Sequence, residues 1–266
     1  MDKTIELVNS IKDIQAMPSV IVRTLNLMKK PTVSMKELGD IVMYDQSLTI
    51  KILALVNSAY YGFSQQISSI TIALSLLGMV KVKNIIVAVA MKPMMSNAGD
   101  KELWKHSIRV AAGCEYLAKL TKIMDSDEAF IAGFIHDVGK IVLHTSNPKM
   151  YSKVIDVRNN GDTDILEIER HYFDSDHVKT GSLLAKRWQL PILLANIVSY
   201  HHNPSLSSIP VPCNLVNAVD ALMQDNFNPN KMDKDFLKTL GIDFEDLEDL
   251  RAAIMSKAEL LIAELT

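Results

Sequence analysis

The chain has 266 residues, 48% of them hydrophobic, and a formal net charge of −3 from 28 basic and 31 acidic residues. This length and apolar content suffice for one or two well-filled cores. The near balance of charge excludes the strong basic excess typical of proteins that bind nucleic acid or anionic membranes. We therefore expect partners among proteins and small ligands, with no binding to nucleic acid or membrane.

Cysteine usage and the start of the chain indicate the compartment. Cys114 and Cys213 lie far apart, so neither a disulfide framework nor a thiolate zinc site is indicated, and a reducing environment fits. The first residues, Met1–Glu6, are too polar for a secretory signal, and no uninterrupted apolar run reaches the roughly 18 to 20 residues that span a bilayer. The expected location is the cytoplasm.

Apolar residues recur at three- and four-residue spacing along almost the whole chain, whereas the alternating pattern of strands is nearly absent. This pattern predicts an all-α fold. In the first third of the chain, residues that favour helix ends flank the apolar stretches. They are Pro18 at the start of a helix, a capping box of Ser34 with Glu37, Asp45 before a helix over residues 46–57, and Gly78 after a helix over residues 69–77.

A further helix is expected over Met79–Met94, with an apolar stretch that indicates burial on most sides. The polar stretch Ser96–Asp100 interrupts it, and a second polar stretch, Gln224–Asp235, precedes a charged C-terminal segment. We therefore expect a two-lobed helical bundle. Its parts are an N-terminal lobe over residues 1–95, a second lobe over residues 100–224 and a C-terminal helical extension over residues 232–266.

Six helices are predicted in the second lobe, and five of them carry a His or Asp able to bind a metal ion. They cover Lys101–Leu120, Ser126–Leu143, Asp164–Tyr172, Ser175–Trp188, Pro191–His201 and Pro212–Met223. His136 and Asp137 are adjacent on the second of these helices, behind an apolar segment. On a helix they point about 100° apart and can contact one ion from neighbouring directions. We expect this pair to be the centre of the chemistry.

Further His and Asp side chains follow on other predicted helices: His106, His177, the adjacent pair His201-His202, and Asp220. A buried carboxylate needs a partner, because leaving it unpaired costs several kcal/mol, and a metal ion supplies one. Imidazole together with carboxylate favours Zn, Mn, Fe or Ni over Mg or Ca alone. The sequence therefore predicts a centre that holds one or two divalent transition metal ions.

Each of these residues also has an ordinary interpretation, because a single His on a helix is usually hydrogen-bonded or exposed. Their order on separate helices of one lobe is what favours a metal site. His144 and His171 fall outside that order and are interpreted as ordinary residues. Glu102 lies one helical turn before His106, and a solvated helix residue is its more ordinary interpretation.

A set of short motifs runs in order from about residue 10 to about residue 220. In the second half it consists of His106, His136-Asp137-Val138-Gly139-Lys140, His177, His201-His202 and Asp220. In the first half it consists of residues 14–20, 44–49, 55–62 and 67–70, with Leu77-Gly78. The second-half motifs resemble the HD superfamily of metal-dependent phosphohydrolases, most closely the branch of HD-GYP cyclic dinucleotide phosphodiesterases. With the first-half motifs, the chain is similar to the HDOD family, the HD-related output domains.

This resemblance implies an all-helical bacterial signalling module whose second lobe is folded like an HD domain. HDOD domains act as output or regulatory elements, and many have lost HD ligands, whereas this chain keeps most of them. By motif match, one metal site would consist of His106, His136, Asp137 and Asp220. Asp137 would bridge to a second metal held by His177, His201 and His202.

The chain departs from the HD-GYP pattern after the paired histidines His201-His202. No glutamate follows the pair, and the Asp-Gly-x-Gly-Tyr-Pro loop that holds the cyclic dinucleotide is missing. The interval to Asp220 is correspondingly short. The ligands of the metal are therefore kept, while recognition of a cyclic dinucleotide is in doubt.

Three functions are consistent with this pattern. We favour a non-catalytic or weakly catalytic module that binds a signalling protein or small ligand and uses metal as a structural clip or sensor. The large N-terminal lobe outside the HD motifs and the missing dinucleotide loop support it, and bound metal can stabilise a fold without turnover. The alternative is a metal-dependent phosphohydrolase acting on a nucleotide or other phosphoester through metal-activated water. Asp137 and Lys140 would then be catalytic, although a surface cation near a helix C-terminus is an equally good interpretation of Lys140. The third is a buried polar network without metal.

Overall fold

In the computed structural model, the described residues are 2–11, 17–28, 30, 33–58, 61, 63, 65–97, 101–161 and 163–265. They form helices joined by turns and contain no strand, which confirms the predicted all-α fold. Some of the motif residues lie outside the described part of the chain, as does the end of the first polar break. These are Ile14, Gln15, Ala16, Ala59, Tyr60, Gly62 and residues 98–100.

The chain divides into two compact units. The smaller comprises Met17–Pro93 and Ser256–Thr266, and the larger comprises Met1–Ala16 and Met94–Met255. Each unit is therefore built from two separate stretches of the sequence. The three parts expected over residues 1–95, 100–224 and 232–266 stay a prediction.

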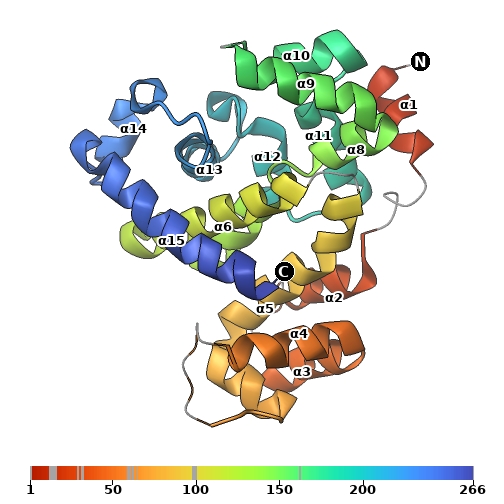
Figure 1. The fold of residues 1–266 in the computed structure, drawn as a ribbon, viewed down its shortest axis with the longest axis vertical. Helices are drawn as coiled ribbons and strands as arrows, with labels where there is room; N and C mark the ends of the chain where they lie inside the picture. The colour runs from red at the N-terminus through yellow and green to blue at the C-terminus, as the bar shows by residue number, and fades with distance from the viewer. Residues whose placement is uncertain are drawn as a thin grey trace. The chain divides into compact units, whose positions relative to one another are not determined.

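The smaller unit contains α2 (Ser19–Met28), α3 (Met35–Met43), α4 (Gln46–Val56) and most of α5 (Ile70–Asn97). Figure 1 shows α3 and α4 side by side. Leu38 and Val42 of α3 are buried, as are Ile52 and Leu55 of α4. The apolar stripes of these helices therefore form the core of this unit.

The helix starts of this unit follow the predicted capping residues. Ser34 Oγ accepts a hydrogen bond from the Glu37 backbone N at 3.2 Å, and Glu37 Oε2 accepts one from the Ser34 backbone N at 2.9 Å. Asp45 Oδ1 accepts from the Leu48 backbone N at 3.0 Å. Both predicted caps are confirmed, because each satisfies backbone N–H groups that the first turn leaves without a partner.

Helix α5 is broken at Gly78, whose φ of 78° and ψ of 159° are non-helical. Glycine adopts a positive φ readily because it has no Cβ. The helix predicted over residues 69–77 and the helix predicted over Met79–Met94 are thereby confirmed, one on each side of the break.

The segment Ile70–Met95 of α5, with a mean hydropathy of 1.9, is the one helical stretch of the described chain long and apolar enough to cross a membrane. The sequence was expected to contain no uninterrupted apolar run long enough to span a bilayer. This helix reaches that length because a few polar residues interrupt its apolar ones. However, 56% of its most apolar part is buried within the protein. Core helices share this length and composition, so the segment is weak evidence for a membrane span.

The larger unit carries every predicted metal ligand. Its helices are α1 (Lys3–Ser10), α6 (Lys101–Thr121), α7 (Ser126–Ile135), α8 (Gly139–Ser146), α9 (Pro148–Asn160), α10 (Ile165–Phe173), α11 (His177–Arg187), α12 (Ile192–Tyr200), α13 (Pro210–Leu222), α14 (Lys234–Thr239) and the first part of α15 (Leu247–Leu265). Short 3₁₀ turns lie at Pro204–Leu206, Pro229–Lys231 and Phe244–Asp246. Helix α9 lies outside the helices predicted from the sequence, although Asn147 caps it and Pro148 occupies its first turn.

The single helix predicted over Ser126–Leu143 is wrong. The chain forms α7 and α8 instead, with a turn at residues 136–138 between them. Gly139 starts α8 against α11, where an added Cβ would lie 1.9 Å from the His177 carbonyl oxygen. The chain therefore turns where α8 has to pack closely against α11, and His136 and Asp137 lie in the turn instead of on a continuous helix.

Candidate metal centre

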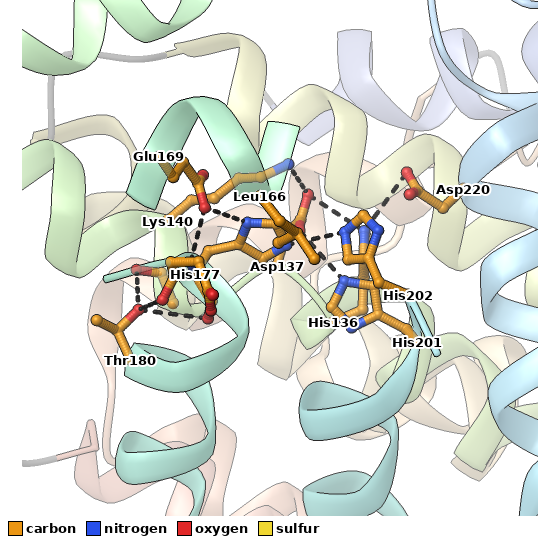
Figure 2. Close-up of polar contacts among 12 residues, drawn as sticks. His136, Asp137, Lys140, Leu166, Glu169, His177, Thr180, His201, His202 and Asp220 are labelled. Atoms are coloured by element: carbon orange, nitrogen blue, oxygen red, sulfur yellow. Dashed lines mark hydrogen bonds and ion pairs between the residues drawn. The ribbon is translucent and has the colours of Figure 1, made fainter. Parts of the chain in front are cut away.

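The predicted ligands converge from five places in the larger unit. His106 lies on α6, His136-Asp137 in the turn after α7, His177 at the first residue of α11, His201-His202 directly after α12, and Asp220 on α13. Figure 2 shows the labelled members of this set pointing toward one another. They form two groups of four in which one candidate ligand atom per residue lies within 4.8 Å of the others. The groups are His106, His136, Asp137 and Asp220, and Asp137, His177, His201 and His202.

Asp137 belongs to both groups and is 1% exposed. Its Oδ2 lies 3.2 Å from His136 Nε2 and 3.8 Å from His106 Nε2. Its Oδ1 lies 3.3 Å from His177 Nε2 and 3.7 Å from His201 Nε2. Each oxygen of this carboxylate therefore faces a different group.

Each group has further close contacts of its own. In the first, Asp220 Oδ1 lies 2.9 Å from His106 Nε2 and 3.6 Å from His136 Nε2. In the second, His177 Nε2 lies 3.0 Å from His202 Nε2. Two imidazole nitrogens that face each other at this distance are what two ligands of a common ion require.

The buried rings have their second nitrogen occupied by a hydrogen bond. His136 Nδ1 lies 2.7 Å from the Gly133 carbonyl oxygen, and His201 Nδ1 lies 3.1 Å from the Ile197 carbonyl oxygen. His177 Nδ1 lies 2.7 Å from Glu169 Oε2. Because each Nδ1 faces an oxygen acceptor, it carries a hydrogen, and each ring turns its Nε2 toward the centre.

Three buried atoms of the centre have no hydrogen-bond partner among the described residues: His136 Nε2, Asp137 Oδ1 and His201 Nε2. An unsatisfied buried polar atom costs about 1 to 3 kcal/mol. Atoms that bind one ion at about 2.0 to 2.2 Å lie roughly 3 to 3.6 Å from one another. The spacing of the nitrogens and oxygens therefore fits a metal ion, and the imidazole and carboxylate donors fit Zn, Mn, Fe or Ni.

The two groups differ in the charge they carry without metal. Burial disfavours a charge on His136, but the neighbouring Asp137 carboxylate outweighs this and raises the pKa of His136 to about 10. Burial also opposes ionisation of Asp137, yet His136 and Lys140 hold the pKa of that carboxyl well below its usual range. In the second group, burial lowers the pKa of His177 to about 3 and that of His202 to about 2. At neutral pH His136 therefore holds a proton, whereas His177 and His202 are neutral.

Lys140 contributes a cation to the centre. Its Nζ donates to Asp137 Oδ2 at 2.5 Å, and its side chain is 17% exposed. It lies in the first turn of α8, so its interpretation as a surface cation near a helix C-terminus is wrong. Burial favours the neutral amine, but Asp137 and Asp220 outweigh this and raise the pKa of Lys140.

A cavity of about 450 Å³ borders the centre. His106, Lys140, His202 and Asp220 are among its lining residues, together with Arg109, Arg158 and Phe227. A ligand in this cavity would therefore reach atoms of both groups.

The remaining residues weighed in the sequence lie outside the two groups. Glu102 lines the cavity, but it accepts a hydrogen bond from Lys105 at 2.6 Å and its side chain is 65% exposed. His144 packs against the Tyr151 ring, and His171 packs against the ring of Tyr172.

Two polar residues that hydrogen-bond to side chains of the ligand set, Glu169 and Gln224, were not predicted from the sequence. Glu169 is fully buried on α10 and accepts from His177. Its place four residues after Ile165 and four before Phe173 is a signal, because this spacing puts it on the apolar face of the helix. Gln224 Nε2 donates to Asp220 Oδ1 at 2.7 Å, and its position four residues after Asp220 is the corresponding signal.

An all-helical lobe whose His-Asp and His-His pairs meet around one carboxylate defines the class of HD domains. Within this class, the chain belongs to the HDOD family, whose domain model matches residues 14–204.

Solved crystal structures share the fold. An HDOD domain protein of unknown function from Geobacter sulfurreducens is 22% identical with a TM-score of 0.76, covering 95% of this chain and 96% of that chain. A candidate signal transduction protein from Marinobacter aquaeolei VT8 is 20% identical with a TM-score of 0.76, covering 94% of this chain and 58% of its own. A candidate phosphohydrolase from Shewanella amazonensis SB2B is 19% identical with a TM-score of 0.73, covering 99% and 98%.

The chain spans less than half the length of the curated relatives it matches. A Treponema pallidum protein is 26% identical over 204 residues, which are 74% of this chain and 39% of the relative. A ribonuclease Y from Ureaplasma parvum is 29% identical over 126 residues, which are 47% of this chain and 20% of the relative.

Proposed function

We propose that this chain is a regulatory module of bacterial, cytoplasmic signal transduction, which binds a signalling protein or a small ligand and contains a metal centre. Membership of the HDOD family supports this role, as does the likeness in fold to the Marinobacter protein described as a candidate signal transduction protein. The observation that carries the metal centre is the carboxylate of Asp137, whose two oxygens face two separate sets of histidines.

The residues that would hold metal follow from the two groups. One ion would be bound by His106, His136, Asp137 and Asp220, and a second by Asp137, His177, His201 and His202. The orphaned Nε2 atoms of His136 and His201 would become ligands, which removes the cost of burying them without a partner. The metal would therefore stabilise the fold whether or not any substrate is turned over.

The cavity at the centre favours one alternative, a metal-dependent phosphohydrolase that acts on a nucleotide or other phosphoester. When bound, a divalent metal lowers the pKa of a coordinated water toward neutrality and so supplies a nucleophile. Lys140 would neutralise phosphate charge at the cavity wall and Asp137 would hold both metal positions. The Shewanella protein described as a candidate phosphohydrolase has the same fold.

Metal analysis tests the centre. Elemental analysis of the purified protein should detect stoichiometric Fe, Mn, Zn or Ni, and His136→Ala should lose it. His171→Ala is the matched control, because this ring packs against Tyr172 outside both groups. If the wild-type protein holds no metal after loading with each ion, the proposed metal centre is rejected and the cluster is a buried polar network without metal.

Turnover separates the module from the enzyme. The metal-loaded protein is incubated with bis(p-nitrophenyl) phosphate and with mono- and dinucleotides, and release of product is followed. We expect no turnover above that of the double variant with His136→Ala and Asp137→Ala. Hydrolysis that the double variant abolishes would reject the non-catalytic role and establish the alternative.

A further inference from the structure

Glu169 is a fully buried carboxylate directly behind His177. It lies on α10, and both its oxygens accept hydrogen bonds, of which those from His177 are drawn in Figure 2. Oε2 accepts hydrogen bonds from the His177 backbone N and from His177 Nδ1, each at 2.7 Å. Oε1 accepts a hydrogen bond from the Tyr151 hydroxyl at 3.2 Å. A single oxygen therefore fixes both the main chain and the ring of one candidate ligand.

The position of His177 in its helix explains why it needs this partner. The rings of His136 and His201 are held by carbonyl oxygens from the preceding turn of their own chain, at Gly133 and Ile197. His177 is the first residue of α11, so no helical turn precedes it. Its backbone N–H is also one of the groups that a helix start leaves without an intrahelical acceptor. Both needs are met by Glu169, a side chain from another helix.

The hydrogen bond from His177 Nδ1 to Glu169 orients the His177 ring so that its Nε2 faces the other members of the second group. With Nδ1 held by Glu169, His177 Nε2 points to the centre, 3.3 Å from Asp137 Oδ1 and 3.0 Å from His202 Nε2. The nearest contacts of the first group run instead through Asp220, which Gln224 holds. The two groups therefore have separate supports, Glu169 for one and Gln224 for the other.

We propose that Glu169 is the positioning residue of the second metal position, holding the ring of His177 so that its Nε2 faces the centre. A carboxylate behind a histidine ligand acts in this way in metal sites generally, and its loss typically costs about 10- to 100-fold in affinity. This inference rests on the proposed function, since it requires that His177, His201 and His202 bind metal. Its further consequence is that the metal affinity of each position can be lowered separately, by changing the residue that supports it.

The test is a titration of metal-free protein with Co²⁺, followed by the visible absorption of the bound ion. The wild type should bind two equivalents, and His106→Ala and His202→Ala should each retain one, which identifies the spectrum of each position. Glu169→Gln keeps the size of the side chain and replaces its carboxyl group with an amide. In this variant we expect the affinity for Co²⁺ to fall about 10- to 100-fold at the second position, which is the equivalent that His202→Ala removes. The affinity at the first position should stay within twofold of the wild type. Gln224→Leu, the matched variant of the other group, should weaken only the equivalent that His106→Ala removes.

A second readout does not depend on metal. In metal-free protein labelled with ¹⁵N, the Nδ1–H resonance of His177 should shift in Glu169→Gln, while those of His136 and His201 keep their positions. Tyr151→Phe removes only the hydroxyl that contacts Oε1, so it should weaken the same equivalent less without disturbing the fold.

The outcomes separate this inference from the proposed function. A wild type that binds no Co²⁺ would reject the metal centre itself. If the wild type binds two equivalents and Glu169→Gln and Tyr151→Phe bind both with unchanged affinity and an unchanged His177 resonance, Glu169 has no positioning role. Equal weakening of both equivalents in a Glu169→Gln protein whose thermal unfolding is unchanged would also overturn the assignment to one position.

Discussion

Lys140 Nζ lies 2.5 Å from Asp137 Oδ2, so the carboxylate that both groups share is paired with a cation before any metal binds. Both partners are largely buried, with side-chain exposures of 17% and 1%. A buried carboxylate that loses its cation is left with an uncompensated charge. Lys140 is therefore expected to matter most in the metal-free protein.

Lys140→Met should lower the free energy of unfolding of the metal-free protein by about 3 kcal/mol, because the variant removes one of the cations that offset the charge of the buried Asp137 carboxylate. With Zn²⁺ bound, the ion supplies the positive charge, so the loss should be clearly smaller. Urea unfolding in the presence of chelator and of saturating Zn²⁺ measures both values. Equal losses in the two conditions would contradict a role of Lys140 as a stand-in for metal charge.

Asp137 and Asp220 are predicted to have unequal effects on metal content. Asp137→Asn changes the residue that faces both groups, so both equivalents should be lost, whereas Asp220→Asn should remove one. Elemental analysis of protein dialysed against excess metal gives the stoichiometry. The exposed residue Asp156 on α9 provides the control, and Asp156→Asn should keep the wild-type content. Retention of an equivalent by Asp137→Asn would argue against a shared ligand.

The features that could be predicted from the sequence are local ones. The capping box of Ser34 and Glu37 involves side chains three residues apart, and the break at Gly78 follows from the φ angles open to one residue. The turn at residues 136–138 has no such signal, because the apolar pattern of α7 continues into α8. It depends on the close approach of Gly139 to the His177 carbonyl, a contact between segments distant in sequence.

The candidate site divides in the same way. The ligand types and their order were visible as motifs, and the grouping around Asp137 followed from the resemblance to HD domains. Glu169 was missed because a glutamate within a helix is ordinarily solvated, and its burial depends on how α10 packs near Tyr151 and α11. Supporting residues of this kind are set by tertiary structure, so a local pattern indicates them only weakly.

Gly139→Ala tests the close packing of α8 against α11. The added methyl group would meet the His177 carbonyl oxygen at 1.9 Å and the Gly181 backbone N at 2.6 Å, so the helices must move apart. We expect a loss of about 2 kcal/mol in unfolding free energy and weaker Co²⁺ binding at the second position, since His177 moves with α11. Gly161→Ala is the control, because its nearest contact is an ordinary 3.5 Å. Wild-type stability in Gly139→Ala would show that the backbones are farther apart.

The affinity of the first metal position should depend on pH and that of the second should not, because only the first must release a proton when metal binds. The pKa of His136 is raised to about 10, so metal at the first position competes with a proton throughout the neutral range. Its affinity should rise by up to about tenfold per pH unit between pH 6 and 9. His177 and His202, with pKa values lowered to about 3 and about 2, are already neutral above pH 5. The affinity of the second position should therefore change little over the same range.

A Co²⁺ titration at a series of pH values measures the pH dependence of each position. It uses His202→Ala, which retains the first position, and His106→Ala, which retains the second. Equal slopes would mean that His136 does not hold the proton that the Asp137 carboxylate stabilises.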